Sequence, residues 1–132
     1  MSQRPSMGFL GKFGRSTDLR QFDQALRALD LHPNHVPEAV KITVVNLLKE
    51  DAASSAPNRH SYNAAAEMVA YCMIGAEAFA GANGDPMSRQ VERRIEAAAD
   101  AGDSLDARLI LLTLHAKIIQ PSVVERFRLE SD

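Results

Sequence analysis

A stretch of small residues near the middle of the chain constrains the fold more than any other feature. Between Ala64 and Ala82, ten of nineteen residues are Ala or Gly. Gly84 follows this stretch and is suited to ending a helix, and Asp85 and Pro86 are suited to beginning the next one. Because small side chains let neighbouring backbones approach closely, the stretch predicts a helix packed among other helices.

Composition and charge are those of an ordinary globular protein. The 132 residues are enough to bury a core in one domain, and 45% of them are apolar and 24% charged. A net charge of −2 provides no general attraction to nucleic acid or to an anionic membrane, so we expect no nucleic-acid partner. The chain lacks both an apolar run of about 18 residues and a signal-peptide pattern, which predicts a cytoplasmic protein without a membrane span.

Helical periodicity and helix-ending residues predict an all-α fold. We expect residues 1–16 to form a flexible N-terminal arm. Residues 17–132 are expected to form a single-domain helical bundle of five main helices plus a short C-terminal helix. The main helices are expected over residues 18–31, 37–50, 61–83, 86–101 and 104–119, and the short one from residue 122. Asp85 is expected to cap the fourth main helix, and Ser122 with Glu125 to cap the short one.

The second expected helix is rich in β-branched residues, so a strand is the competing prediction. Pro37 suits the first position of a helix, and apolar residues recur at helical spacing, which favours the helix. Its inner face is expected to consist of Val36, Val40, Val44, Leu47 and Leu48. Ile42 and Val45 are expected to point nearly the other way.

The third and fifth main helices are apolar nearly all round, which is typical of helices at the centre of a core or an interface. On the fifth helix, Asp106, Thr113 and Lys117 fall on one polar strip, and leucines and isoleucines cover most of the rest. Two such helices need more apolar covering than a small bundle easily provides. This excess favours a homodimer, and close packing within one chain is the alternative.

Arg108 and His115 lie seven residues apart, and so on one side of the fifth helix, nearly opposite its polar strip. This Arg-x6-His spacing resembles the motif of the HEPN family of small helical ribonucleases and toxins. The resemblance implies that the Arg and His of two protomers meet at a dimer cleft and cleave RNA, which would make both residues catalytic. The structural alternative is that Arg108 pairs with Glu67 or Glu77 and that His115 bonds a backbone carbonyl.

Other reactive residues show no arrangement that indicates catalysis or a metal site. His32, His35 and His60 match no metal-ligand spacing, so no metal is expected. Cys72 has no base or positive charge beside it, which predicts an inert buried thiol, and as the only cysteine it cannot form an internal disulfide. The chain has no phosphate-binding glycine loop and no nucleophilic serine motif, and no cofactor is expected.

The excess of apolar helix surface and the lack of a catalytic constellation favour protein–protein association without catalysis. We expect a bacterial-type cytoplasmic adaptor or self-associating module whose partner is an unknown protein or a second copy. The alternative is a HEPN-like ribonuclease or toxin component that uses Arg108 and His115. A third hypothesis is a membrane-surface adaptor tethered by Phe9, Leu10 and Phe13 of the arm.

Overall fold

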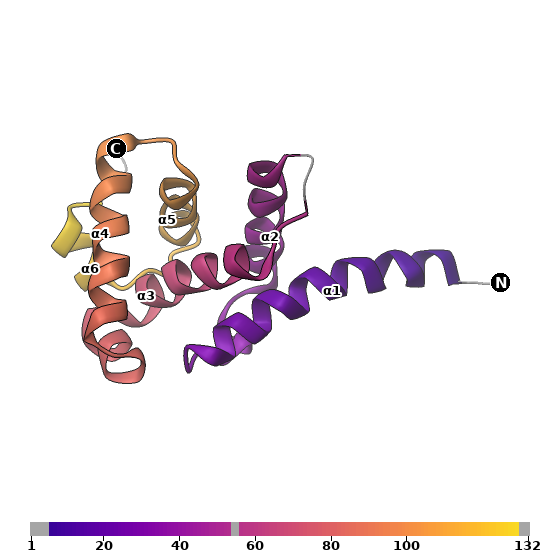
Figure 1. Ribbon diagram of the computed structural model, residues 1–132, viewed down its shortest axis with the longest axis horizontal. Coiled ribbons are helices and arrows are strands. Elements are labelled where there is room, and N and C mark those ends of the chain that lie inside the picture. Colours follow the sequence, from indigo (N-terminus) through magenta and orange to yellow (C-terminus); the bar gives the residue numbers. More distant parts are fainter. Residues whose placement is uncertain (1–5, 54–55, 130–132) are drawn as a thin grey trace.

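The computed structural model describes residues 6–53 and 56–129, and for residues 6–16 it describes the backbone alone. The described residues form six α-helices and no β-strand, so the predicted all-α fold of five main helices and a short C-terminal one is confirmed (Figure 1). The helices are α1 (Ser6–Ala28), α2 (Glu38–Ala52), α3 (Arg59–Asn83), α4 (Asp85–Ala101), α5 (Leu105–His115) and α6 (Pro121–Phe127). A 3₁₀ turn, η1 (Pro33–His35), connects α1 to α2.

The helix α3 lies at the centre of the molecule and packs against each of the other five α-helices. In Figure 1, α2, α4 and α5 run across the direction of α3, while α1 lies more nearly along it and its N-terminal half extends beyond the other helices. The small residues of α3 are largely buried up to Gly75, as the packing prediction requires. By contrast, α5 contacts α2, α3 and α4 on one side only and leaves its other side exposed.

Helix boundaries differ from the sequence prediction where a residue adopts a left-handed conformation. The helix α1 ends when Asp30 takes a φ of 67°, before Pro33, and α5 ends when Lys117 takes a φ of 61°, four residues earlier than expected. At the C-terminal end of α5, Ile118 N donates a hydrogen bond to the Thr113 carbonyl at 3.1 Å. This bond satisfies a carbonyl that the last turn of the helix leaves free. At its other end, α1 begins at Ser6, so most of the expected arm has a helical backbone, and residues 1–5 lie outside the described residues.

Two predicted caps are wrong, whereas Ser104, at which the fifth main helix was expected to begin, caps that helix. Gly84 occupies the cap position of α4 and Asp85 is already its first helical residue. Gln120 precedes α6 without a side-chain cap, because Pro121 starts that helix one residue before Ser122. Ser104 does cap α5, since its Oγ accepts a hydrogen bond from Ala107 N at 3.1 Å.

The central helix is kinked, a feature that the sequence analysis did not predict. Gly75 has φ 91° and ψ 168°, a conformation that is essentially reserved for glycine. In the turn before it, the Cys72 carbonyl accepts a hydrogen bond from Gln120 N at 2.8 Å. The Met73 carbonyl accepts another from Gln120 Nε2 at 2.9 Å. The segment that connects α5 to α6 is therefore hydrogen-bonded to α3 next to the kink.

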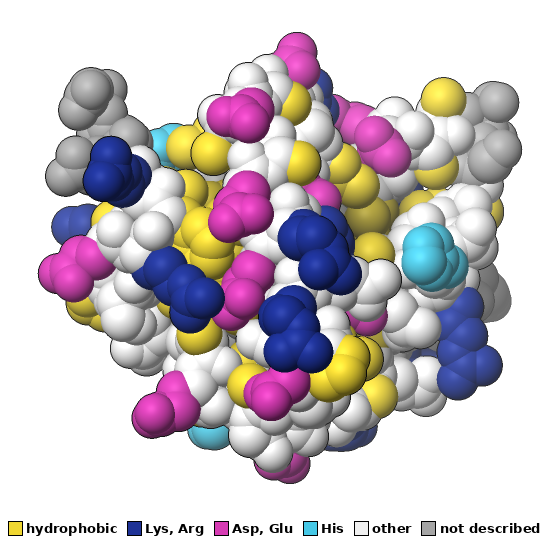
Figure 2. Space-filling view, turned by 60° about the vertical axis from the view of Figure 1, so that its left-hand side comes forward, with side chains coloured by type: hydrophobic (Ala, Val, Ile, Leu, Met, Phe, Trp, Pro, Cys, Tyr) yellow, Lys and Arg dark blue, Asp and Glu magenta, His cyan; other side chains and the backbone are white. Residues whose placement is uncertain are grey.

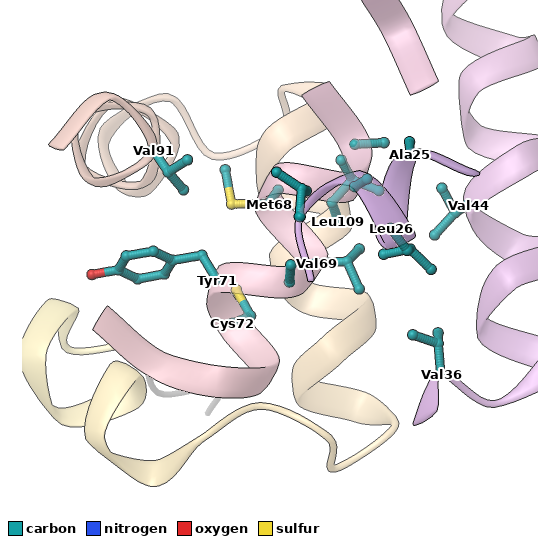
Figure 3. Close-up of a cluster of buried hydrophobic side chains, with 14 of the residues drawn as sticks. Ala25, Leu26, Val36, Val44, Met68, Val69, Tyr71, Cys72, Val91 and Leu109 are labelled. Carbon is teal, nitrogen blue, oxygen red and sulfur yellow. The ribbon is translucent and has the colours of Figure 1, made fainter. Parts of the chain in front are cut away.

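Side chains from most of the helices pack together in one hydrophobic core. Figure 3 shows this cluster, with Leu26 from α1, Val44 from α2, Met68 from α3, Val91 from α4 and Leu109 from α5. The expected inner residues Val40, Val44 and Leu48 of α2 are buried. Val45, which was expected to point outward, is also buried. Because α2 packs against α1, α3 and α5, it buries a wider face than a single stripe.

Candidate functional site

The orientation of α5 reverses the expectation for its polar and apolar sides. Thr113 is fully buried and donates its Oγ1 hydrogen to the Ile110 carbonyl at 2.7 Å. Asp106 also turns toward the other helices, whereas Arg108 and His115 lie on the exposed side. Asp106 and Thr113, which were expected on the solvent side, therefore face inward and have partners inside the molecule, whereas Lys117 of the same strip is exposed.

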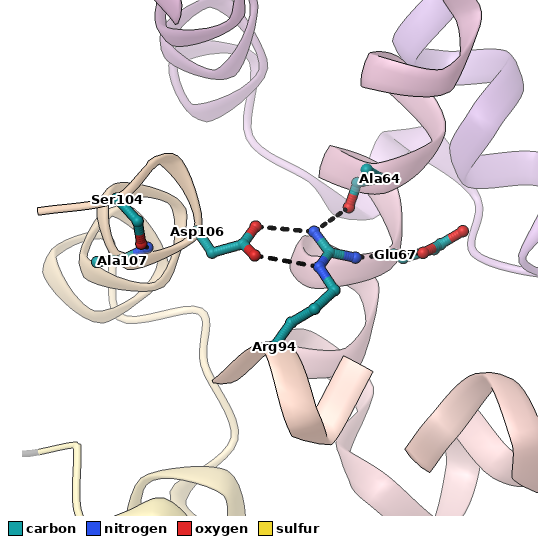
Figure 4. Close-up of polar contacts among 6 residues, drawn as sticks. All are labelled: Ala64, Glu67, Arg94, Ser104, Asp106 and Ala107. Carbon is teal, nitrogen blue, oxygen red and sulfur yellow. Dashed lines mark hydrogen bonds and ion pairs between the residues drawn. The ribbon is translucent and has the colours of Figure 1, made fainter. Parts of the chain in front are cut away.

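The partner of Asp106 is Arg94 of α4, which the sequence analysis overlooked (Figure 4). Nη2 and Nε of Arg94 donate to the two carboxylate oxygens of Asp106 at 2.8 and 3.1 Å, respectively. The same guanidinium donates through Nη1 to Glu67 Oε1 at 3.2 Å and through Nη2 to the Ala64 carbonyl at 2.9 Å. This partly buried cluster joins α3, α4 and α5, and it fixes which side of α5 faces inward.

Arg108 and His115 consequently take neither of the structural roles considered for them. Glu67 belongs to the Arg94 cluster and Glu77 is exposed, so the expected Arg108 pairings are absent. Instead, Arg108 Nη1 lies 3.6 Å from Glu50 Oε1 of α2, in a pair whose side chains are 50% and 68% exposed. The ring of His115 is exposed, and among the described residues it has no hydrogen-bond partner. Both side chains reach solvent from one side of α5.

Leu111 stands between these two residues and is the candidate anchor of an interaction surface. It is 39% exposed, and among residues 17–53 and 56–129, whose side chains the structure describes, no other large hydrophobic side chain is exposed. Beside it lies a groove of about 230 Å³ between the end of α4, α5 and the residues after α6. The groove is lined by Ala98, Ala99, Gly102, Ala107, Ile110, Leu111, Leu114, Arg128 and Leu129. We call Arg108, Leu111, His115 and this groove the α5 surface.

A second polar network, around Glu92, attaches the C-terminal helix. Tyr71 donates its hydroxyl hydrogen to Glu92 Oε2 at 2.7 Å, and Arg126 of α6 lies 3.4 Å from the same oxygen. Burial, and then the hydrogen bond to Glu92, raise the pKa of Tyr71. Phe127 packs edge-on against the Tyr71 ring, with centroids 6.2 Å apart. These contacts hold α6 against α3 and α4. The polar groups of Tyr71, Glu92 and Arg126 therefore have a structural role.

Cys72 is placed as expected for an inert thiol. It is completely buried, and burial raises its pKa from 9.0 to about 12 although a hydrogen bond with Thr113 acts in the opposite direction. Because only the thiolate is a good nucleophile, a buried thiol with a raised pKa is a poor nucleophile at neutral pH.

The histidines near η1 remain on the surface and do not converge on a site. The ring of His32 accepts a hydrogen bond from Asn34 N through Nδ1 at 3.1 Å, and its centroid is 6.1 Å from that of His35. Across residues 6–53 and 56–129, no three His, Cys, Asp or Glu side chains gather as a metal site would require. Figure 2 shows a face on which acidic and basic side chains are interspersed, with hydrophobic side chains between them.

Comparisons with known proteins assign no family to the chain. No family model matches it, and neither a curated protein nor a solved structure is significantly similar to it. Within the described residues, no helix is long and apolar enough to cross a bilayer.

Proposed function

We propose that this chain acts by protein–protein association, without catalysing a reaction, and that the α5 surface binds the partner. The observation that supports this proposal is the exposed Leu111 at the edge of an apolar groove. A few side chains that fill well-packed pockets near the centre of a contact contribute most of the binding energy in protein interfaces. Ala and Gly along the groove let a partner approach closely.

The distribution of reactive groups supports association over catalysis. Arg94, Glu67 and Asp106 are engaged with one another, and Tyr71 and Glu92 hold the C-terminal helix. The thiol of Cys72 is buried. A catalytic site needs a nucleophile or base within hydrogen-bond reach of a bound substrate, and these groups are instead occupied in joining helices.

Leu111→Asp tests this proposal against a matched substitution. Used as bait for quantitative affinity capture, the wild-type chain should retain a protein, either a second copy or another chain, and Leu111→Asp should lose it. Ala78→Asp places the same charge on an exposed position of α3 and should behave as the wild type. Equal capture by both variants, or no capture by the wild type, would contradict the proposal.

A second candidate function is RNA cleavage by Arg108 and His115, which resemble the HEPN motif. It is favoured by the exposure of both side chains on the same side of α5. Replacing His115 with Ala should then abolish cleavage of RNA by the purified chain while leaving its thermal unfolding unchanged. Cleavage that persists in His115→Ala, or its absence from the wild type, would remove this alternative.

A further inference from the structure

We infer that the N-terminal half of α1, residues 6–16, binds the surface of an anionic lipid membrane through the side of the helix that carries Phe9, Leu10 and Phe13. This inference goes beyond the proposed function, because it concerns a different part of the molecule from the α5 surface. It is supported by where these residues lie on α1 and by the charge of the segment around them.

The two halves of α1 have different surroundings. The bundle holds the C-terminal half, in which Phe22 and Leu26 are fully buried. Asp18 accepts a hydrogen bond from the Tyr62 hydroxyl at 2.9 Å and pairs with Lys49 Nζ at 2.9 Å. The N-terminal half extends beyond the other helices (Figure 1), and residues 6–16 span about 16 Å of helix. This half is therefore placed to lie along a flat surface.

The apolar positions of the N-terminal half do not continue the buried stripe of the C-terminal half. Successive helical residues turn by about 100°. Arg15 lies seven residues before Phe22, and so in register with the buried side of α1. Phe13 lies nine residues before Phe22, which is half a turn away. Phe9 and Leu10 flank Phe13 within about 60° around the helix. These three residues therefore form a separate apolar side, opposite the one that the bundle covers.

The charge of this segment suits an anionic surface. Residues 1–20 carry a net charge of +3, whereas the rest of the chain carries −5. Within residues 6–16, the charged residues are Lys12 and Arg15, which lie about 100° and 160° from Phe13 around the helix. Helices that lie in a membrane interface combine Phe and Leu on one side with Lys and Arg on the other. Charges separated by more than about 8 Å are largely screened at physiological ionic strength, so much of the acidic charge of the bundle is not felt by this half.

A membrane surface fits this short apolar side better than a groove on another protein. Helices that dock in protein grooves carry apolar anchors that continue to the seventh residue after the first. The positions seven residues after Phe9 and Leu10 are occupied by Ser16 and Thr17. A membrane requires no particular shape, and each Lys or Arg near its surface strengthens binding to anionic lipid about fivefold.

Cosedimentation with lipid vesicles tests the inference. The full wild-type chain should sediment with vesicles of equal parts phosphatidylglycerol and phosphatidylcholine, and much less with vesicles of phosphatidylcholine alone. Phe13→Asp should abolish this binding without changing thermal unfolding, because residue 13 lies outside the part of α1 that the bundle holds. Ala78→Asp adds the same charge at an exposed position of α3 and should bind as the wild type does.

A second pair of variants tests the role of the basic residues. Replacing both Lys12 and Arg15 with Gln should weaken binding to the anionic vesicles roughly 25-fold. Replacing Arg89 and Arg93 with Gln removes the same charge from exposed positions of α4 and should leave binding unchanged.

The inference is overturned if the wild type does not bind the anionic vesicles, if it binds both kinds of vesicle equally, or if Phe13→Asp and Ala78→Asp bind equally. A wild-type chain that ignores vesicles but retains a protein in a Phe13-dependent way would show that a protein covers this side of α1 instead. Capture that depends on Leu111 judges the proposed function separately, so either idea can fail without the other.

Discussion

Single polar residues inside this protein join helices that hydrophobic packing alone would not orient. Tyr62 of α3 donates to Asp18 Oδ1 of α1 at 2.9 Å, and Arg94 of α4 holds the start of α5. Lys41 is buried beside Asp23, with its Nζ 3.2 Å from Oδ1. Because a buried polar group that loses its partner costs free energy, each of these contacts specifies one arrangement of its helices.

Tyr62 should make stability fall at high pH. Burial, and then the hydrogen bond to Asp18, raise the pKa of Tyr62 from 10.0 to about 12. The folded state therefore favours the neutral phenol, and this stabilisation is present below pH 10.0 and is lost as the pH rises toward about 12. Between about pH 9 and pH 11, the free energy of unfolding of Tyr62→Phe should fall by about 1 kcal/mol less than that of the wild type. Equal losses in urea titrations at the two pH values would contradict this assignment.

Arg94→Lys should destabilise the chain by about 2 kcal/mol, because one ammonium group cannot bridge two carboxylates and a carbonyl as the planar guanidinium does. The neighbouring Arg93 is exposed on the same helix, so Arg93→Lys is the matched control and should change stability by less than about 0.5 kcal/mol. Chemical unfolding of the two variants gives the comparison. Equal effects would show that the Arg94 cluster contributes nothing specific.

At the scale of elements, the kink in α3 decides how the C-terminal segment docks. A Cβ at residue 75 would lie 3.6 Å from Ser122 Oγ and 3.8 Å from Gln120 Cγ, which is ordinary contact. Gly75→Ala should therefore destabilise through backbone strain alone, by about 1 to 3 kcal/mol.

Gly81 supplies the control for this prediction, because it lies in the same helix and a Cβ added there would meet no atom within 4 Å. Gly81→Ala should stabilise the chain by about 0.5 to 1 kcal/mol, since alanine loses less backbone freedom than glycine in a helix. Thermal unfolding of both variants gives the signs. Stabilisation by Gly75→Ala would mean that α3 is not kinked in solution.

The sequence predicted those structural features that depend on nearby residues, and it missed those that depend on distant ones. Apart from the start of α1, prolines and glycines located the helix ends to within a few residues, because a residue such as Pro37 or Gly102 limits the backbone wherever it occurs. Gly75 and Gly81 look alike in sequence, and in the structure the segment with Gln120 and Ser122 lies beside Gly75 but not beside Gly81. The inward side of α5 depends on Arg94, whose signal was its place on the apolar stripe of α4, three residues after Val91.

At the scale of the whole molecule, the sequence predicted how two residues of the α5 surface lie but not the surface as a whole. Arg108 and His115 were singled out correctly as sharing one side of a helix, but their exposure was not expected. The sequence treated Leu111 as one of several leucines on the apolar part of α5. The groove beside it could not be predicted, because it also involves the end of α4 and residues after α6. Surfaces built from three separate segments leave no pattern in any one of them.

Sedimentation velocity of the wild-type chain over a concentration series tests the central claim most directly. A chain of 14.4 kDa that pairs through the α5 surface should move from the monomer toward twice that mass as its concentration rises. Leu111→Asp should remain at 14.4 kDa throughout with an unchanged circular dichroism spectrum. A wild-type chain that stays monomeric at every concentration and also retains no other protein, or a dimer that Leu111→Asp leaves intact, would contradict the account.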